Sequence, residues 1–189
     1  LESLTGAELA ATMVVGTLGG ELSGEDLFAP APNLIFTRDL AAVVGQTIVV
    51  GNANKAARQR ETMLAWSVFE GHQRFLDTRI ARSSTRVHEA GGSAPLTIEG
   101  GDVLVISPTV ACIGASERTS WAMIIRLATE LLGNGMERVL VVEMPKQRSS
   151  MHLDTVFTMA DRGVGVVYPP LLTPGGPEEA KVLSLSREN

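Results

Sequence analysis

The 189-residue sequence predicts an α/β fold built from a repeated strand–strand–helix–strand unit. Two observations support this class: short β-branched runs alternate with amphipathic helical segments, and the runs recur in register along the chain. An apolar content of 44% is enough for a sizeable core, so residues 1–189 are expected to form a single domain. Within it we expect a helical segment at about residues 1–24, core repeats at about 30–168, and a polar tail or short helix at about 170–189.

Four helices are expected, at about residues 5–18, 53–71, 117–132 and 178–185. Thr5 and Glu8 have the spacing of a capping box, in which each side chain satisfies a backbone N–H at the helix start. Ser116 is the expected N-cap of the third helix, and Gly133 is expected just after its end. Pro177 precedes the fourth helix and suits a first helical turn.

Seven short β-branched runs predict buried strands, at residues 40–44, 47–50, 103–106, 110–113, 139–142, 155–159 and 164–167.

These runs form a repeat with a period of roughly 50 to 60 residues, a range typical of units repeated around an axis or in an array. Asp39 precedes two strands and is followed twelve positions later by Gly51. Asp102 precedes the next pair and is followed by Gly114, also twelve positions later. Asp154 opens a third copy. A circular arrangement of the units would direct these carboxylates at one shared site.

The acidic residues Asp39, Glu99, Asp102 and Asp154 are the first candidates for function. Any one of them alone is more often a turn or helix cap. Carboxylates brought together raise one another's pKa and need a cation to share, so the cluster predicts a metal or a cationic ligand. A planar guanidinium matches paired carboxylates especially well.

His152 and Asp154 are expected to lie in a strand, where a separation of two positions puts their side chains on one face about 6.6 Å apart. An imidazole beside a carboxylate can act as a general acid and base, so His152 is interpreted as functional. His72 and His88 lie in polar surroundings and are interpreted as surface residues.

Arg58 and Arg118 stand near helix starts, where the helix dipole disfavours a cation unless an anion is supplied. Two interpretations stay open for them: a salt bridge to Glu61 or Glu117, or binding of a ligand's carboxylate. The single cysteine, Cys112, lies mid-strand between apolar neighbours and is interpreted as a core residue.

Composition excludes several classes of partner. A net charge of −5, scattered basic residues and an aromatic content of 4% argue against nucleic acid. No apolar run approaches the roughly 18 residues of a membrane span. One cysteine excludes an internal disulfide framework and favours a reducing compartment, so a cytoplasmic location is expected. No cofactor and no resident metal are expected.

Five segments carry a resemblance to a known family: PNLIFTRD at 32–39, ARQRET at 57–62, IEGGD at 98–102, IGASERT at 113–119 and MHLDTVFTM at 151–159. In this order they resemble the arginine deiminases of the guanidino-group-modifying superfamily. The resemblance implies an α/β propeller of five ββαβ units, of which this chain would hold about three. It also implies hydrolysis of L-arginine to L-citrulline and ammonia through a cysteine-bound intermediate.

The resemblance assigns a role to each candidate residue. Asp39 and Asp154 would hold the substrate guanidinium, and His152 and Glu99 would serve proton transfer and positioning. Arg58, Arg118 and Asn33 would bind the substrate's carboxylate. Phe36 would line the pocket, and Asp102 would support a neighbouring charge.

The main departure from the family is that its nucleophile lies in a C-terminal motif, which Cys112 does not match. A smaller departure is His72-Gln73, where family members tend to have His-Pro. We therefore expect a partial domain that is inactive alone. The first alternative is a non-catalytic guanidino-ligand binder or homo-oligomer, since an open propeller exposes strand edges. The second is a metal-dependent hydrolase using Glu99, Asp102, His152 and Asp154.

Overall fold

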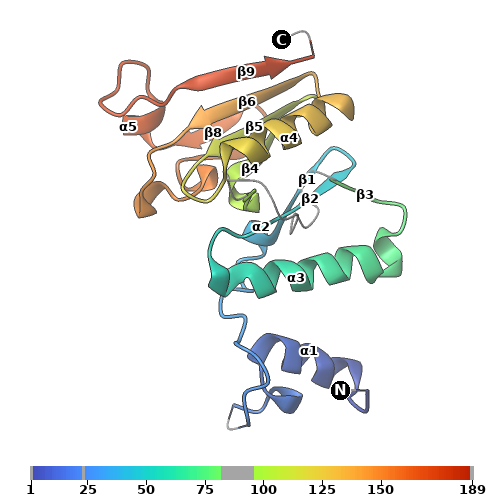
Figure 1. Ribbon diagram of the computed structural model, residues 1–189. Coiled ribbons are helices and arrows are strands. Elements are labelled where there is room, and N and C mark those ends of the chain that lie inside the picture. The colour runs from blue at the N-terminus through green and yellow to red at the C-terminus, as the bar shows by residue number, and fades with distance from the viewer. Residues whose placement is uncertain (1, 23, 82–95, 188–189) are drawn as a thin grey trace.

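The computed structural model describes residues 2–22, 24–81 and 96–187 and shows a mixed α/β fold with several small sheets (Figure 1). The first sheet has the order β1-β2-β3, in which β2 pairs antiparallel with β1 and parallel with β3. A helix, α3, connects the parallel pair, so the predicted ββαβ unit is confirmed here. The bounds are β1 Ala41–Val44, β2 Thr47–Val50, α3 Ala56–Gly71 and β3 Arg79–Ile80.

The second sheet repeats this arrangement and adds one strand, in the order β4-β5-β6-β9. Strand β5 pairs antiparallel with β4 and parallel with β6, and β9 pairs antiparallel with β6. Helix α4 connects β5 to β6, as the repeat predicts. The bounds are β4 Val103–Ser107, β5 Val110–Ala115, α4 Trp121–Gly133, β6 Arg138–Glu143 and β9 Val182–Ser186.

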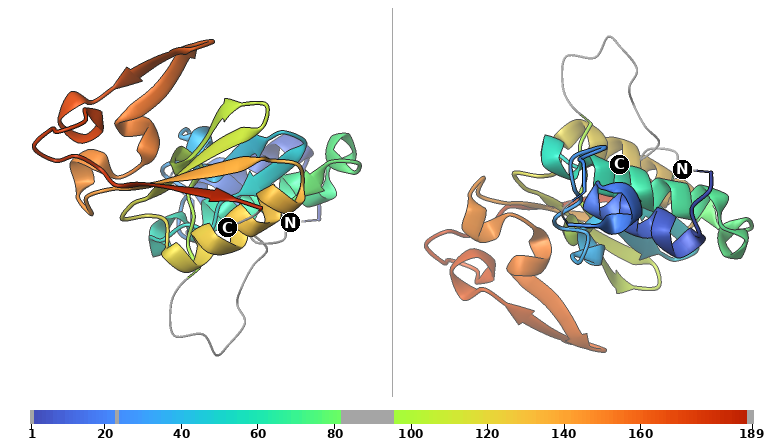
Figure 2. Two further views of the ribbon diagram at one scale, coloured as in Figure 1. Left: turned by 90° about the horizontal axis from the view of Figure 1, so that it is seen from above. Right: turned by 90° about the horizontal axis from the view of Figure 1, so that it is seen from below.

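The third predicted copy is a two-stranded hairpin of β7 (Phe157–Asp161) and β8 (Val164–Val167), followed by the short helix α5 (Pro169–Leu172). The next strand, β9, returns to β6 of the second sheet and does not join β8. Viewed from above, the hairpin projects away from the first two sheets (Figure 2). The predicted turn around Asp161 and Gly163 is confirmed by its register.

The N-terminal helix α1 (Gly6–Val15) begins with the predicted capping box, in which Thr5 and Glu8 bond each other's backbone. A short 3-10 turn, η1 (Leu18–Gly20), follows it. Arg60 on α3 attaches this region, because its Nη2 donates to the carbonyl of Met13 at 2.6 Å and its guanidinium lies 4.6 Å from the centre of the Phe28 ring. Figure 1 shows α1 below α3, and the view from below in Figure 2 shows α1 in front of α3.

The main core lies between α4 and the second sheet. Helix α4 presents a buried stripe at helical spacing that includes Ile124, Leu127 and Leu131. These side chains pack against Val139 and Val141 of β6 and extend the cluster to the first sheet. Burial of large aliphatic side chains contributes roughly 1.5–3 kcal/mol each, so this stripe is the main stabilising element of the unit. Of the described helices, none has the length and apolar character that crossing a bilayer requires.

Three local predictions are wrong. Ser116 is not the N-cap of α4; Ser120 takes that position, because the hydroxyl of Ser116 binds Asp102. Gly133 is the last helical residue, and Asn134 is the C-cap. Residues 178–185 do not form a helix, because the apolar alternation at 182–185 pairs with β6 as β9.

A fourth wrong prediction concerns the strand at 155–159, which begins only at Phe157. Its first residues form a 3-10 turn, η6 (Leu153–Thr155), in which the Thr155 hydroxyl donates to the carbonyl of His152 at 2.6 Å. His152 and Asp154 therefore lie on a turn, and the expected placement on one face of a strand does not hold. The remaining short elements are α2 Thr37–Leu40, η2 Gln73–Phe75, η4 Gly100–Asp102 and η5 Arg148–Ser150.

Candidate active site

A cavity of about 640 Å³ lies where the two units and the η6 turn meet. It brings together seven of the nine predicted site residues. Glu99 and Asp102 are buried behind its wall and do not line it. The lining residues are Asn33, Ile35, Phe36, Thr37, Arg38, Asp39, Arg58, Arg118, Arg148, Met151, His152, Asp154 and Thr155.

The central feature is a buried histidine–carboxylate pair. Nε2 of His152 donates to Oε2 of Glu99 at 2.7 Å, and Nδ1 lies 3.4 Å from Oδ1 of Asp39. Burial lowers the pKa of His152, but the bond to Glu99 and the charges of Asp102, Asp39 and Glu99 outweigh it, so the pKa is raised. Burial raises the pKa of Glu99. The hydrogen bond to His152 and the charges of His152, Arg118 and Arg58 outweigh burial, so the pKa of Glu99 is lowered overall. The imidazolium–carboxylate form is therefore favoured.

A glycine and a buried carboxylate position the imidazole. Gly101 packs against the ring so closely that a Cβ there would lie 2.8 Å from Nδ1 of His152. The residue after the histidine is held as well, because the N–H of Leu153 donates to Oδ1 of Asp102 at 2.8 Å. The IEGGD segment thus supplies Glu99 as the partner of the ring and the space in which the ring lies.

Asp102, which lies at the start of the second unit, is fully buried. Its Oδ2 accepts hydrogen bonds from the hydroxyls of Ser116 and Thr119, each at 2.6 Å, and its Oδ1 accepts one from the Leu153 N–H. Burial raises its pKa to about 6 against the opposing effect of these bonds and of His152. Asp102 forms no ion pair with a described arginine, so it acts as an internal brace for the turn that carries His152.

Arg58 lies between two carboxylates in the first turn of α3. Its Nη1 is 2.5 Å from Oδ2 of Asp39, and its Nε is 2.7 Å from Oε2 of Glu61. Glu61 is fully buried and also accepts the N–H of Asn33 at 2.8 Å. Burial lowers the pKa of Arg58, but the bonds to Asp39 and Glu61 raise it overall. The salt-bridge interpretation is confirmed for Arg58.

Arg118 is the less satisfied arginine. Its Nη1 is 3.7 Å from Oε1 of Glu99, and its Nε is 3.6 Å from Oε1 of Glu117, beyond hydrogen-bonding distance. That Nε is buried and has no hydrogen-bond partner among the described residues. Glu117 is itself engaged by Lys55 at 3.1 Å. Arg118 therefore keeps donors available to a ligand in the cavity.

Asp154 is the carboxylate of the cavity that remains unbonded. It is half-buried on η6 and makes no hydrogen bond or ion pair with a described residue. Burial raises its pKa, a repulsion from Asp39 adds to this, and His152 and Arg38 oppose it. Arg38 donates from Nη2 to the carbonyl of Val103 at 2.6 Å. A cationic ligand would relieve the electrostatic cost at Asp154.

The two remaining predicted residues lie at the cavity mouth, where Phe36 is 57% exposed and Asn33 precedes it by one turn. Cys112 is buried in an apolar cluster with Leu104 and Leu153, and burial raises the pKa of its thiol to about 12. The prediction of a core cysteine is confirmed. Of the other histidines, His72 is exposed, as predicted, and His88 lies outside the described residues.

Sequence reasoning missed the roles of three residues of this neighbourhood, and it named Glu61 only as a possible salt-bridge partner of Arg58. Glu61 and the hydroxyls of Ser116 and Thr119 complete the buried networks, and Arg148 lines the cavity. A signal was available for Glu61, which stands three positions after Arg58 on a helix. The hydroxyls carried no comparable signal, because their roles depend on contacts between distant segments.

Three donors also meet a geometric condition for a metal: oxygens of Asp39 and Glu99 and a nitrogen of His152 lie within 4.8 Å of one another. These groups already bond to one another, and Arg58 contacts both carboxylates, at 2.5 and 3.8 Å. A divalent cation would have to replace the His152–Glu99 bond and oppose the guanidinium. The donor set therefore fits a proton-relay network better than a metal centre.

Structural comparison finds the same fold in solved structures. The chain superimposes on a mutant of AgrE in a complex with L-arginine, with a TM-score of 0.56 and 24% identity over 74% of this chain and 18% of that chain. It also superimposes on the DDAH of Pseudomonas aeruginosa in a complex with citrulline, with a TM-score of 0.52 and 22% identity over 68% and 44% of the two chains. The chain thus shares the fold of these two proteins over about 70% of its length.

Sequence comparison gives the family. The arginine deiminase model matches residues 19–186. The arginine deiminase of Listeria monocytogenes serotype 4a is 38% identical over 159 residues, and that of Oenococcus oeni is 37% identical over 164. These alignments cover 83% and 86% of this chain but only 37% and 38% of the relatives. The chain belongs to the arginine deiminase family and spans a little over a third of the length of these curated relatives.

Proposed function

We propose that this chain supplies the guanidino-binding and proton-transfer part of an arginine deiminase, which converts L-arginine and water to L-citrulline and ammonia. The observation that carries the proposal is the buried His152–Glu99 pair, 2.7 Å long, in a cavity wall that also presents Asp39 and Asp154. Family membership supports it. Because the chain covers about 37% of its relatives, the activity belongs to a polypeptide with further segments.

Binding of the guanidinium is assigned to Asp39 and Asp154. A guanidinium presents five N–H donors in a planar fork, which two carboxylates on opposite sides can accept. Asp154 has no competing partner among the described residues, whereas Asp39 shares one oxygen with Arg58 and turns the other toward His152. Arg58 thereby orients Asp39, and the ligand's own charge replaces the missing cation at Asp154.

Proton transfer is assigned to His152, with Glu99 holding the ring. A thiolate adds to the guanidinium carbon, and the protonated His152 donates its proton to the amino group that leaves as ammonia. Neutral His152 then accepts a proton from water as the oxygen adds to the thiouronium carbon. Collapse of this adduct forms the citrulline carbonyl and expels the thiolate, and the hydroxyl proton passes to the released ammonia, which leaves as ammonium. His152 is then protonated as at the start. The raised pKa of His152 suits the first, acidic role.

The thiolate of this scheme comes from the C-terminal motif that the family resemblance implies. Cys112 is unsuited to the role, because it is buried in an apolar cluster and its thiol pKa is raised to about 12. The two described ββαβ units would then belong to a five-unit propeller whose other units and nucleophile lie elsewhere in the polypeptide. Exposed valines on β8 (Val164, Val166 and Val167) offer a surface for such packing or for a second copy.

The test measures citrulline formation from L-arginine by this chain and by a longer polypeptide that includes the cysteine motif. We expect no citrulline from the 189-residue chain and turnover by the longer polypeptide. In the longer polypeptide, His152→Gln should reduce turnover by a factor on the order of 100 or more, as removal of a general acid–base does. Citrulline formed by the short chain would disprove the assignment of the nucleophile. Binding of L-arginine without turnover by either polypeptide would favour the non-catalytic guanidino binder.

A further inference from the structure

A second cavity, of about 320 Å³, lies beside the first, and the proposed function gives it no role. The two cavities share one lining residue, Thr155. Its volume is at the lower end of the range of about 300–1,000 Å³ that is usual for small-molecule sites. The cavity therefore suits a ligand of few atoms. The lining residues are Pro145, Gln147, Ser149, Ser150, Thr155, Val156, Tyr168, Leu171 and Glu178.

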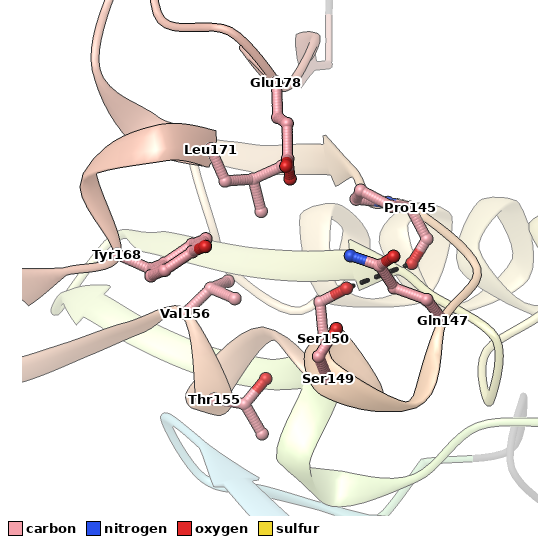
Figure 3. A pocket seen from close by; sticks show the side chains of 9 residues that line it. All are labelled: Pro145, Gln147, Ser149, Ser150, Thr155, Val156, Tyr168, Leu171 and Glu178. Carbon is pink, nitrogen blue, oxygen red and sulfur yellow. Dashed lines mark hydrogen bonds between the residues drawn. The ribbon is translucent and has the colours of Figure 1, made fainter.

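Three polar side chains converge in this cavity. Figure 3 shows the carboxylate of Glu178, the amide of Gln147 and the hydroxyl of Tyr168 directed into the same space. They come from three segments: the chain around η5, the N-cap of α5, and the loop after α5. None of these three side chains forms a hydrogen bond or ion pair with a described residue. Their bonding capacity is therefore available to a ligand.

Apolar side chains form another part of the lining. Val156 and Leu171 are 4% and 1% exposed and belong to one apolar cluster, which also contains Leu153. Both side chains line the cavity beside the polar groups (Figure 3). A ligand with a short hydrocarbon part could thus bury it here while its polar end meets the converging side chains.

Backbone hydrogen bonds fix the two segments that flank α5. The N–H of Tyr168 donates to the carbonyl of Val156 at 2.7 Å, which joins the start of α5 to the end of η6. The N–H of Glu178 donates to the carbonyl of Pro170 at 3.1 Å, which ties the loop after α5 back to the helix. The cavity is therefore formed before a ligand binds, and little ordering of the backbone is needed on binding.

The third segment, residues 145–150, is closed on itself and contributes no charge to the lining. The hydroxyl of Ser150 donates to the carbonyl of Pro145 at 3.3 Å, as the dashed line in Figure 3 shows. Lys146 and Arg148 alternate along the chain with lining residues, but neither lines this cavity, and Arg148 lines the first one. Glu178 is thus the charged side chain of the described lining, and the cavity favours a cation.

We propose that this cavity binds a small primary alkylammonium ion. A primary ammonium has three N–H donors, and the Glu178 carboxylate, the Gln147 amide oxygen and the Tyr168 hydroxyl offer three acceptors from different sides. Its alkyl chain would pack against the apolar lining. The proposal does not rest on the proposed function, because none of the residues that the function uses lines this cavity.

The experiment is a titration of the isotope-labelled 189-residue chain with n-butylammonium, followed by nuclear magnetic resonance. We expect saturable shifts of the Gln147 side-chain amide and of the backbone amides of Tyr168 and Glu178. Millimolar affinity is expected, since a ligand of this size makes few contacts. The neutral probe 1-butanol has the same alkyl chain without the charge, and it should bind at least about fivefold more weakly.

Glu178→Gln should weaken butylammonium binding about fivefold, because the carboxylate that accepts from the ammonium is neutralised. Glu70→Gln is the matched control, because Glu70 is an exposed carboxylate on α3 that lines neither cavity. It should leave the affinity unchanged. The spectrum of each variant without ligand verifies that the variant is folded.

No saturable shift at Gln147 and Tyr168 would overturn the proposal. Equal affinities for butylammonium and 1-butanol, or for the parent and Glu178→Gln, would overturn it as well, since the charge of Glu178 would then play no part. Shifts confined to residues of the first cavity, such as Arg118 and Met151, would place the ammonium there instead. All of these results leave the proposed function standing, because that function is tested with L-arginine.

Discussion

The two ββαβ units have the same strand order and senses, yet they use the acidic residue that opens each unit differently. Asp39 opens the first unit, lines the cavity and contacts Arg58 and His152. Asp102 opens the second unit and is fully buried beneath the turn that carries His152. One position in the repeat thus lines the cavity in one copy and is an internal brace in the other.

The sequence explains this difference at two further positions of the repeat. Fourteen and seventeen residues after Asp102 stand Ser116 and Thr119, whose hydroxyls bond its carboxylate. At the same distances after Asp39 stand Ala53 and Ala56, which have no donor to offer. Asp39 therefore has no hydroxyl partners, and its carboxylate is available to an arginine and a ligand. Two hydroxyls decide which carboxylate is braced.

Replacing each aspartate should separate the two roles. Asp102→Ala leaves the Ser116 and Thr119 hydroxyls and the Leu153 N–H without their acceptor, so we expect a loss of about 3 kcal/mol in the free energy of unfolding. Asp39→Ala leaves Arg58 paired with Glu61, and a loss of about 1 kcal/mol is expected. Urea unfolding at pH 7 measures both. Equal losses would contradict the division into brace and ligand group.

Gly114, twelve positions after Asp102, packs closely against the Asp102 carboxylate. A Cβ at Gly114 would lie 2.5 Å from Oδ1 of Asp102 and 2.9 Å from Cβ of Leu153. Gly114→Ala should therefore displace the brace and cost about 2 kcal/mol. Gly133→Ala is the control, because no atom lies within 4 Å of the Cβ position at the end of α4, and this change should stabilise by up to about 1 kcal/mol. Thermal unfolding ranks the two, and a Gly114→Ala variant as stable as the parent would argue against a close-packed brace.

The smallest expected effect is a pH dependence of the free energy of unfolding, which comes from the His152–Glu99 pair. The pKa of His152 is raised in the folded chain, so its contribution to stability is fully present below about pH 6.5, its unfolded value, and is lost as the pH rises through the folded value. The pKa of Glu99 is lowered, so its contribution is present above its unfolded value and is lost as the pH falls through the folded value.

The difference in unfolding free energy between the parent and His152→Gln should therefore shrink by about 1 kcal/mol as the pH rises from 6 to 9. His72→Gln provides the control, since His72 is exposed on the first unit. A difference that stays constant across this pH range would show that the His152–Glu99 pair does not carry the expected charge.

Sequence patterns predicted most of the fold, because local signals determine it. The capping box at Thr5, the strand pairs and the α4 stripe depend on neighbouring residues, and the structure has them where expected. The strand β9 was missed because it is a short segment with polar flanks and little local strand signal. It forms an edge strand only because it pairs with β6, about 45 residues earlier in the chain. The N-cap of α4 was misplaced because Ser116 meets a carboxylate from another segment.

The candidate site was predicted less completely than the fold. Asp39, Arg58, Arg118 and His152 meet as the motifs indicate. The motif order does not reveal which carboxylate is open and which is sealed, since Asp39 and Asp102 have the same position in the repeat. Arg148 was missed for a related reason: only the three-dimensional turn before His152 brings its side chain to the cavity.

The most direct test of the account is a calorimetric titration of L-arginine into the 189-residue chain and into Asp154→Asn. The account predicts binding by the parent chain and at least about tenfold weaker binding by Asp154→Asn, because the unbonded carboxylate of the cavity is neutralised. Asp161→Asn, an exposed change in the β7–β8 hairpin, should bind like the parent. Equal affinity of Asp154→Asn and the parent chain, or no heat from the parent at millimolar L-arginine, would contradict a guanidinium clamp in this cavity.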